Sequence, residues 1–228
     1  MIPVLGIPVI GRFDLLAACL ASITEPVGRL VIVDNSPDGL SDVLCPAAVA
    51  DLCVTRPPSN LGYAGSINHI IRTHPGAPWW CFTAADVVFA PGDLDRLASV
   101  MTGARWVGIN GDWRAFGLTS AAVERIGLWD ENFFPAYCED ADYEYRCTLG
   151  GVEWGFIGGD TTHAGSTTIQ EAHYARRNAA TYPSNVAYYQ AKWGGPLRGG
   201  ERFTTPFDRG GSVADWALDI GRLRDNAW

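Results

Sequence analysis

The stretch LVIVDNSPDG at residues 30–39 decides the fold, because four apolar residues run directly into a set of turn formers. A short apolar run with turn residues behind it is typical of a strand that is buried on both faces of a sheet. The chain repeats this pattern, with strands expected at Val4–Val9, Leu30–Val33, Leu52–Thr55, Trp79–Phe82 and Trp106–Ile109, and helices between them at Phe13–Ser22, Ser66–Arg72 and Asp93–Met101. Alternating strands and helices predict an α/β fold with a mostly parallel central sheet and helices on both faces.

The regular alternation stops near residue 110. Further strands are expected at Phe116–Ser120 and Trp154–Ile157, with a helix at Asp140–Leu149 between them. Glu171–Trp193 has helical character, but Pro183 should break or kink it, and a Gly-rich loop and a short amphipathic helix at Val213–Leu223 should follow. We therefore expect a core domain over residues 1–168 and a C-terminal helical and Gly-rich extension over residues 169–228.

Composition excludes several classes of protein. With 228 residues, 47% of them hydrophobic and 18% charged, the chain can bury a core and is not disordered. Its net charge of −8 argues against nucleic acid as a partner, because phosphates are bound by clustered cations. No window holds the roughly 20 apolar residues that a membrane span needs, and the apolar first ten residues lack the basic start of a signal peptide. The six cysteines form no Cys-x-x-Cys pair and lie mostly in apolar runs, which suits a soluble chain in the reducing cytoplasm.

Polar side chains follow several of the expected strands. In open parallel sheets, ligands bind beyond the carboxyl ends of the strands. Asp34 follows the second strand and can accept hydrogen bonds from a nucleobase or a ribose, although it also fits an ordinary turn. Asp86 follows Trp79–Phe82 and can coordinate Mg²⁺ or Mn²⁺ together with a diphosphate, or serve as a cap. His163 follows the last strand in a small polar loop, where a ligand role competes with a structural one.

Two glycines precede the second helix. The stretch Asn60–Asn68 contains Gly62 and Gly65, which allow a ligand to approach the backbone closely, and the helix start offers N–H groups to an anion. Its spacing matches neither a P-loop nor a Rossmann fingerprint. An ordinary loop with a Gly-containing helix start is the alternative interpretation.

Four acids fall within six residues at Glu139–Glu144, where a helix is expected to begin. Acids at a helix start compensate the macrodipole, which is one explanation. However, the aromatic residues of 127–137 precede them, and a poorly hydrated carboxylate has a pKa raised toward the range of a general base. Arg146, beyond Asp140 on the same helix, could orient or neutralise one of the acids.

In this order and spacing, the stretches resemble glycosyltransferase family 2, the inverting enzymes of the GT-A fold that use nucleotide sugars. The likeness is greatest to bacterial and phage rhamnosyl- or galactofuranosyl-transferase-like members. It rests on residues 7–9, 31–36, 60–65, 85–89 and 127–131, on Glu139-Asp140 with Arg146, and on His163. The tail adds only the Tyr-rich stretch at 188–195, which ends in Lys192-Trp193-Gly194-Gly195.

The resemblance assigns roles to individual positions. It implies that Asp140 is the general base, that Glu139 aligns the acceptor, and that Asp86 with His163 holds Mn²⁺ or Mg²⁺. The residues expected to bind the donor nucleotide sugar are Pro8, Asp34, Asn35, Asn60, Gly62, Gly65, Asn68, Asp86, Lys192 and Trp193. Lys192 and Trp193 would cover the donor site or form a homodimer contact. One departure stands out: residue 84, two before Asp86, is alanine where the family's Asp-x-Asp motif has an acid.

The expected activity is transfer of a sugar from a UDP- or dTDP-sugar to a hydroxyl of a glycan, lipid-linked or protein acceptor. Inverting transfer needs a base, charge stabilisation for the leaving diphosphate, and no covalent intermediate. A sugar-phosphate nucleotidyltransferase is one alternative, although the basic Gly-rich loop it needs near the N-terminus is missing at residues 6–12. An inactive sugar-nucleotide-binding or structural protein of the same fold is another, and Ala84 keeps it open.

Overall fold

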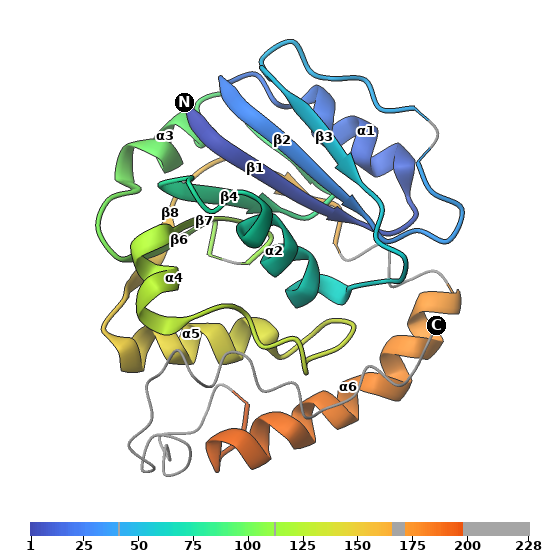
Figure 1. The fold of residues 1–228 in the computed structure, drawn as a ribbon, viewed down its shortest axis with the longest axis vertical. Helices are drawn as coiled ribbons and strands as arrows, with labels where there is room; N and C mark the ends of the chain where they lie inside the picture. The colour runs from blue at the N-terminus through green and yellow to red at the C-terminus, as the bar shows by residue number, and fades with distance from the viewer. Residues whose placement is uncertain (41, 112, 166–171, 198–228) are drawn as a thin grey trace.

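The computed structural model describes residues 1–40, 42–111, 113–165 and 172–197. A central sheet of seven strands runs in the order β3-β2-β1-β4-β7-β6-β8 (Figure 1). Its strands are β1 (Ile2–Val9), β2 (Val27–Asp34), β3 (Leu52–Thr55), β4 (Trp79–Thr83), β6 (Arg105–Ile109), β7 (Ala115–Thr119) and β8 (Glu153–Ile157). Only β7 runs antiparallel among these strands, pairing with β4 and β6, so the predicted mostly parallel sheet is confirmed.

Helices cover both faces of the sheet, as predicted. The helices are α1 (Phe13–Ala21), α2 (Gly62–Thr73), α3 (Asp93–Val100), α4 (Ser120–Ile126), α5 (Glu139–Gly150) and α6 (Ala172–Trp193). One apolar core joins α1 and α3 to the sheet, and a second joins α2, α4 and α5 to its other face. A third cluster packs α6 on α5 through residues such as Tyr145 and Trp193, so α6 lies outside the layer of α5 (Figure 1).

The structure corrects one of the two outcomes predicted for Pro183, a break in the helix. A single helix, α6, runs through this position instead of breaking there. Proline removes the N–H that would bond the carbonyl of Ala179, but both residues are exposed, so water can satisfy that carbonyl. The end of the predicted Gly-rich loop and the helix at Val213–Leu223 lie outside the described residues. The domain boundary at residue 168 stays a prediction.

Two short strands form a separate ribbon that the sequence did not predict. β5 (Val87–Val88) pairs antiparallel with β9 (Thr162–His163), with Val87 opposite His163. This pairing brings the segment after β4 next to the segment after β8. No helix among the described residues is long and apolar enough to cross a membrane.

Candidate active site

A cavity of about 340 Å³ opens where β1, β2 and β4 end at their carboxyl side. It lies at the sheet edge where parallel folds bind ligands. Of the predicted site residues, it brings together Pro8, Asn35, Asn60, Gly62, Asp86, Glu139, Asp140 and His163. Residues as far apart in the sequence as Pro8 and His163 therefore meet around one space.

Asn35 organises the end of the cavity beside α2. Its Oδ1 accepts a hydrogen bond from the Leu61 N–H at 2.9 Å, and its Nδ2 donates to Ser66 Oγ at 3.0 Å. Gly62 begins α2 with φ of +68°, and a Cβ there would lie 2.8 Å from the Phe134 ring and 2.8 Å from the Pro135 carbonyl oxygen. Both the left-handed backbone and the close approach require glycine at this position.

Asp86 and His163 form a pair on the cavity wall, because the β5–β9 ribbon places their segments side by side. Asp86 Oδ1 lies 3.0 Å from His163 Nε2, and the two side chains are 7% and 10% exposed. His163 Nδ1 accepts hydrogen bonds from the Gly165 N–H and from the Arg114 guanidinium. Because both partners are donors, the proton of a neutral His163 lies on Nε2 and faces the carboxylate.

The pair fits a divalent metal as a site with two protein ligands. A carboxylate oxygen suits Mg²⁺ and Mn²⁺, and an imidazole nitrogen is a common additional ligand. The described residues contain no group of three or more His, Cys, Asp or Glu side chains that could hold a metal. The other ligands would therefore have to come from a diphosphate and water, and His163 would need its ring proton on Nδ1 to bind through Nε2.

Glu139 and Asp140, at the start of α5, face the same cavity. Tyr137 and Cys138 have positive φ values of 77° and 75°, so the chain turns sharply before the helix begins. Glu139 is buried, whereas Asp140 is partly exposed and accepts a hydrogen bond from the Ala141 N–H at 2.8 Å. Asp140 thus presents a carboxylate that a bound substrate can reach.

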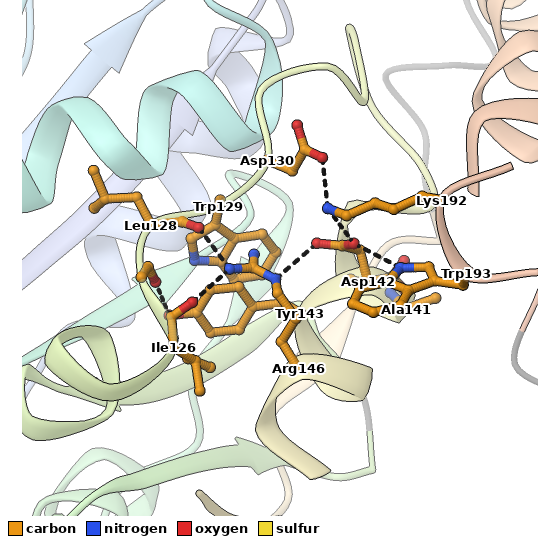
Figure 2. Close-up of polar contacts among 12 residues, drawn as sticks. Ile126, Leu128, Trp129, Asp130, Ala141, Asp142, Tyr143, Arg146, Lys192 and Trp193 are labelled. Carbon is orange, nitrogen blue, oxygen red and sulfur yellow. Dashed lines mark hydrogen bonds and ion pairs between the residues drawn. The ribbon is translucent and has the colours of Figure 1, made fainter. Parts of the chain in front are cut away.

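Arg146 does not line the cavity and is bonded to Asp142 instead of Asp140 (Figure 2). Its Nε donates to Asp142 Oδ2 at 3.0 Å, and its Nη1 donates to the carbonyls of Ile126 and Leu128, both at 2.8 Å. Arg146 and Asp142 are fully buried. The arginine therefore ties α5 to the end of α4 and the loop that follows it.

Lys192 and Trp193 also lie away from the cavity, in the same buried cluster (Figure 2). Lys192 Nζ is 2.7 Å from Asp130 Oδ2 and 2.8 Å from Asp142 Oδ1, and Trp193 Nε1 donates to Asp142 Oδ1 at 2.8 Å. Burial alone would raise the pKa of Asp142, but the neighbouring Lys192 and Arg146 cations hold it below its usual value. We name Asp130, Asp142, Arg146, Lys192 and Trp193 the α5–α6 cluster.

Three further predicted residues support the site from behind instead of lining it. The buried carboxylate of Asp34 accepts hydrogen bonds from the N–H groups of Ser36 at 3.0 Å and Leu40 at 2.7 Å, so it shapes the turn after β2. Asn68 Oδ1 accepts from the Trp129 N–H at 2.9 Å, and its Nδ2 donates to the Trp129 carbonyl at 2.8 Å. Gly65 is buried inside α2.

The sequence prediction missed the part of the wall that α6 and Arg114 supply. Tyr174, Arg177 and Asn178 line the cavity from the first half of α6. Their spacing of three and four residues places them on one helix face, which the sequence could have shown. Asn185, further along α6, donates to the carbonyl of Ala136 at 2.9 Å and so holds the loop before α5 against this helix.

Comparison with known proteins agrees with this arrangement. The family model described as Glycosyl transferase family 2 matches residues 5–151. A galactofuranosyl glycosyltransferase from Leishmania donovani is 22% identical over an alignment of 333 positions. The alignment covers 98% of this chain and 75% of that protein.

Solved structures show the same fold at low identity. TarS residues 1–349 from S. aureus align with a TM-score of 0.51 and 12% identity over 69% of this chain. GalNAc-T7, solved with UDP, GalNAc and Mn²⁺, aligns with a TM-score of 0.57 and 12% identity over 99% of this chain. The alignments span 58% and 57% of those two proteins, so they support the α/β fold of the GT-A type. With the family match across most of its core, the chain belongs to glycosyl transferase family 2.

Proposed function

We propose that this glycosyltransferase moves a sugar from a UDP- or dTDP-sugar to an acceptor hydroxyl, with inversion at the anomeric carbon. The observation that carries the proposal is the meeting of Asp140 with the Asp86–His163 pair around one cavity of about 340 Å³. A cavity of this size falls within the range of small-molecule sites. The proposed base and the proposed diphosphate-binding groups thus face one shared space, in which acceptor and donor would meet.

Asp140 acts on the acceptor side as the general base. Its carboxylate takes the proton of the acceptor hydroxyl while that oxygen attacks the anomeric carbon. The bond between this carbon and the diphosphate oxygen breaks on the opposite face, and a single displacement inverts the configuration. Glu139, in the same helical turn and on the same cavity wall, accepts a hydrogen bond from the acceptor and orients it.

Asp86 and His163 act on the donor side. They would hold Mn²⁺ or Mg²⁺, which, when bound, supplies Lewis-acid stabilisation of the leaving diphosphate. The presence of UDP and Mn²⁺ in the GalNAc-T7 structure supports this choice of ligands. Asn35, Asn60 and Gly62 would then shape the nucleoside end of the cavity.

Partners and location follow from the same proposal. The acceptor is a glycan, a lipid-linked sugar or a protein, and the wall supplied by α6 is the surface that would select it. All six cysteines are free thiols, which supports the predicted cytoplasmic location. The predicted homodimer stays a prediction, although the side chain of Lys192 is 6% exposed and Trp193 is buried within the chain, so these two side chains do not provide its contact.

The Asp140→Asn variant tests the base. The amide has the shape of the carboxylate but takes up no proton, so we expect transfer to fall by about 10²–10⁴-fold. UDP affinity, measured by calorimetry with Mn²⁺, should stay within about twofold because the change lies on the acceptor side. Asp86→Ala is the matched control and should lose UDP affinity under the same conditions. Near-normal turnover by Asp140→Asn would contradict the assignment of the base.

A further inference from the structure

Arg114 stands beside the position where this chain departs from the family's metal motif. The Ala84 N–H donates to the Arg114 carbonyl at 2.7 Å, immediately beyond the paired residues Thr83 and Ala115 of β4 and β7. The exposed Arg114 side chain reaches His163 Nδ1. Ala84, Asp86, Arg114 and His163 all line the cavity. A cation therefore occupies the neighbourhood in which a second acid is missing.

The charges of Asp86, His163 and Arg114 balance one another without a metal. Asp86 contributes one negative charge, neutral His163 none and Arg114 one positive charge, so the three side chains together are neutral. Two acids in place of Ala84 and Asp86 would repel a diphosphate unless a metal lay between them. Glu139 and Asp140 enter the cavity from α5, and Arg177 enters it from α6. The donor end thus already holds a fixed cation of its own.

Arginine is well suited to this task. The guanidinium is always charged, and its planar array of N–H groups can donate two parallel hydrogen bonds to phosphate oxygens. One of its partners, His163 Nδ1, is a neutral acceptor that an anionic phosphate oxygen can outcompete.

We infer that Arg114 binds the diphosphate of the donor and carries part of the charge neutralisation that an Asp-x-Asp-bound metal would carry alone. This inference rests on the proposed function, because it takes the ligand to be a nucleoside diphosphate. Its consequence is that nucleoside diphosphate binding persists without a divalent cation and depends there on the guanidinium. Metal and arginine would then act on the same phosphates, each adding to the affinity.

The test is calorimetric binding of UDP and of dTDP in EDTA and again in Mn²⁺, with four variants. Arg114→Met should lower the affinity in EDTA by about tenfold or more, because a hydrogen bond to a charged group is lost. Arg114→Lys keeps the positive charge and should therefore recover part of the affinity that Arg114→Met loses. Ala84→Asp should weaken nucleotide binding in EDTA and increase the rise in affinity that Mn²⁺ brings. Arg125→Met is the matched control, since that exposed arginine donates to the Gly151 carbonyl outside the cavity, and it should bind like wild type.

The outcomes separate the inference from the proposed function. Wild-type binding in Mn²⁺ but none in EDTA, or equal affinities of wild type and Arg114→Met in EDTA, would overturn the role of Arg114 and leave the glycosyltransferase proposal standing. Failure of wild type to bind either nucleotide in both buffers would overturn both. Far-UV circular dichroism spectra and urea midpoints that match wild type establish that each variant is folded. Ala84→Asp tests the charge argument while leaving Arg114 in place.

Discussion

Replacing Lys192 with methionine should destabilise the protein far more than a usual lysine substitution. Lys192 is 6% exposed and contacts two carboxylates, Asp130 and Asp142, that are fully buried. With Arg146, these four side chains have no net charge, and Lys192→Met leaves one uncompensated negative charge in the interior. Removing one partner of a buried ion pair costs about 3–5 kcal/mol, so the free energy of unfolding should fall by that amount.

Urea unfolding at pH 7, followed by tryptophan fluorescence, measures the effect of Lys192→Met. The matched control is Arg72→Met, which breaks the Arg72–Glu131 pair at the same kind of distance, 3.0 Å, but with the arginine 50% exposed. An exposed pair contributes about 0–1 kcal/mol. A further variant that combines Lys192→Met with Asp142→Asn restores neutrality and should regain part of the loss. Equal losses for Lys192→Met and Arg72→Met would refute the argument from burial.

The pH dependence adds an independent check on Lys192→Met. In wild type, the pKa of Asp142 lies below its usual 3.8 despite burial, because of Lys192 and Arg146. This carboxylate therefore adds stability above about pH 4 that is lost as the pH falls through its folded pKa. Without Lys192, burial shifts that pKa upward, and protonation relieves the uncompensated charge. The difference in unfolding free energy between wild type and variant should consequently narrow as the pH is lowered from 7 toward 4.

The remaining predictions concern single positions. Gly62→Ala forces a Cβ against the Phe134 ring at a left-handed position, so it should cost about 1–3 kcal/mol of stability and lower UDP affinity in calorimetry. Asp34→Ala removes the acceptor of two backbone N–H groups and should cost about 1–3 kcal/mol in urea unfolding, whether or not nucleotide affinity changes. A brief treatment with a thiol reagent at pH 8 should label the exposed Cys45 and spare Cys19, because burial raises the pKa of Cys19 to about 12. Mass spectrometry of the peptides measures the labelling, and equal labelling of the two cysteines would contradict the prediction.

Much of the fold was predictable because its signals are local. A continuous apolar run such as Leu30–Val33 is typical of a strand that is buried on both faces, and β2 is such a strand. Similar runs also marked the edge strands β3 and β8, whose residues are half-buried or exposed. The antiparallel direction of β7 and the β5–β9 ribbon were not predictable in this way. Strand direction and ribbon pairing depend on segments far apart in the chain, and no local pattern records them.

The candidate site was likewise predictable only in part. The rule that ligands bind beyond the carboxyl ends of parallel strands was enough to predict that Asp86 and His163 share one cavity, and Glu139 and Asp140 of α5 lie there too. It could not place Arg146, Lys192 and Trp193, which resemble binding residues in sequence but lie in the α5–α6 cluster. A charged side chain contacts whatever packing brings within reach, so its partner depends on how α6 lies on α5. Local pattern therefore determined at which edge of the sheet the predicted site residues gather, whereas helix packing decided which cations face the cavity and which are buried between helices.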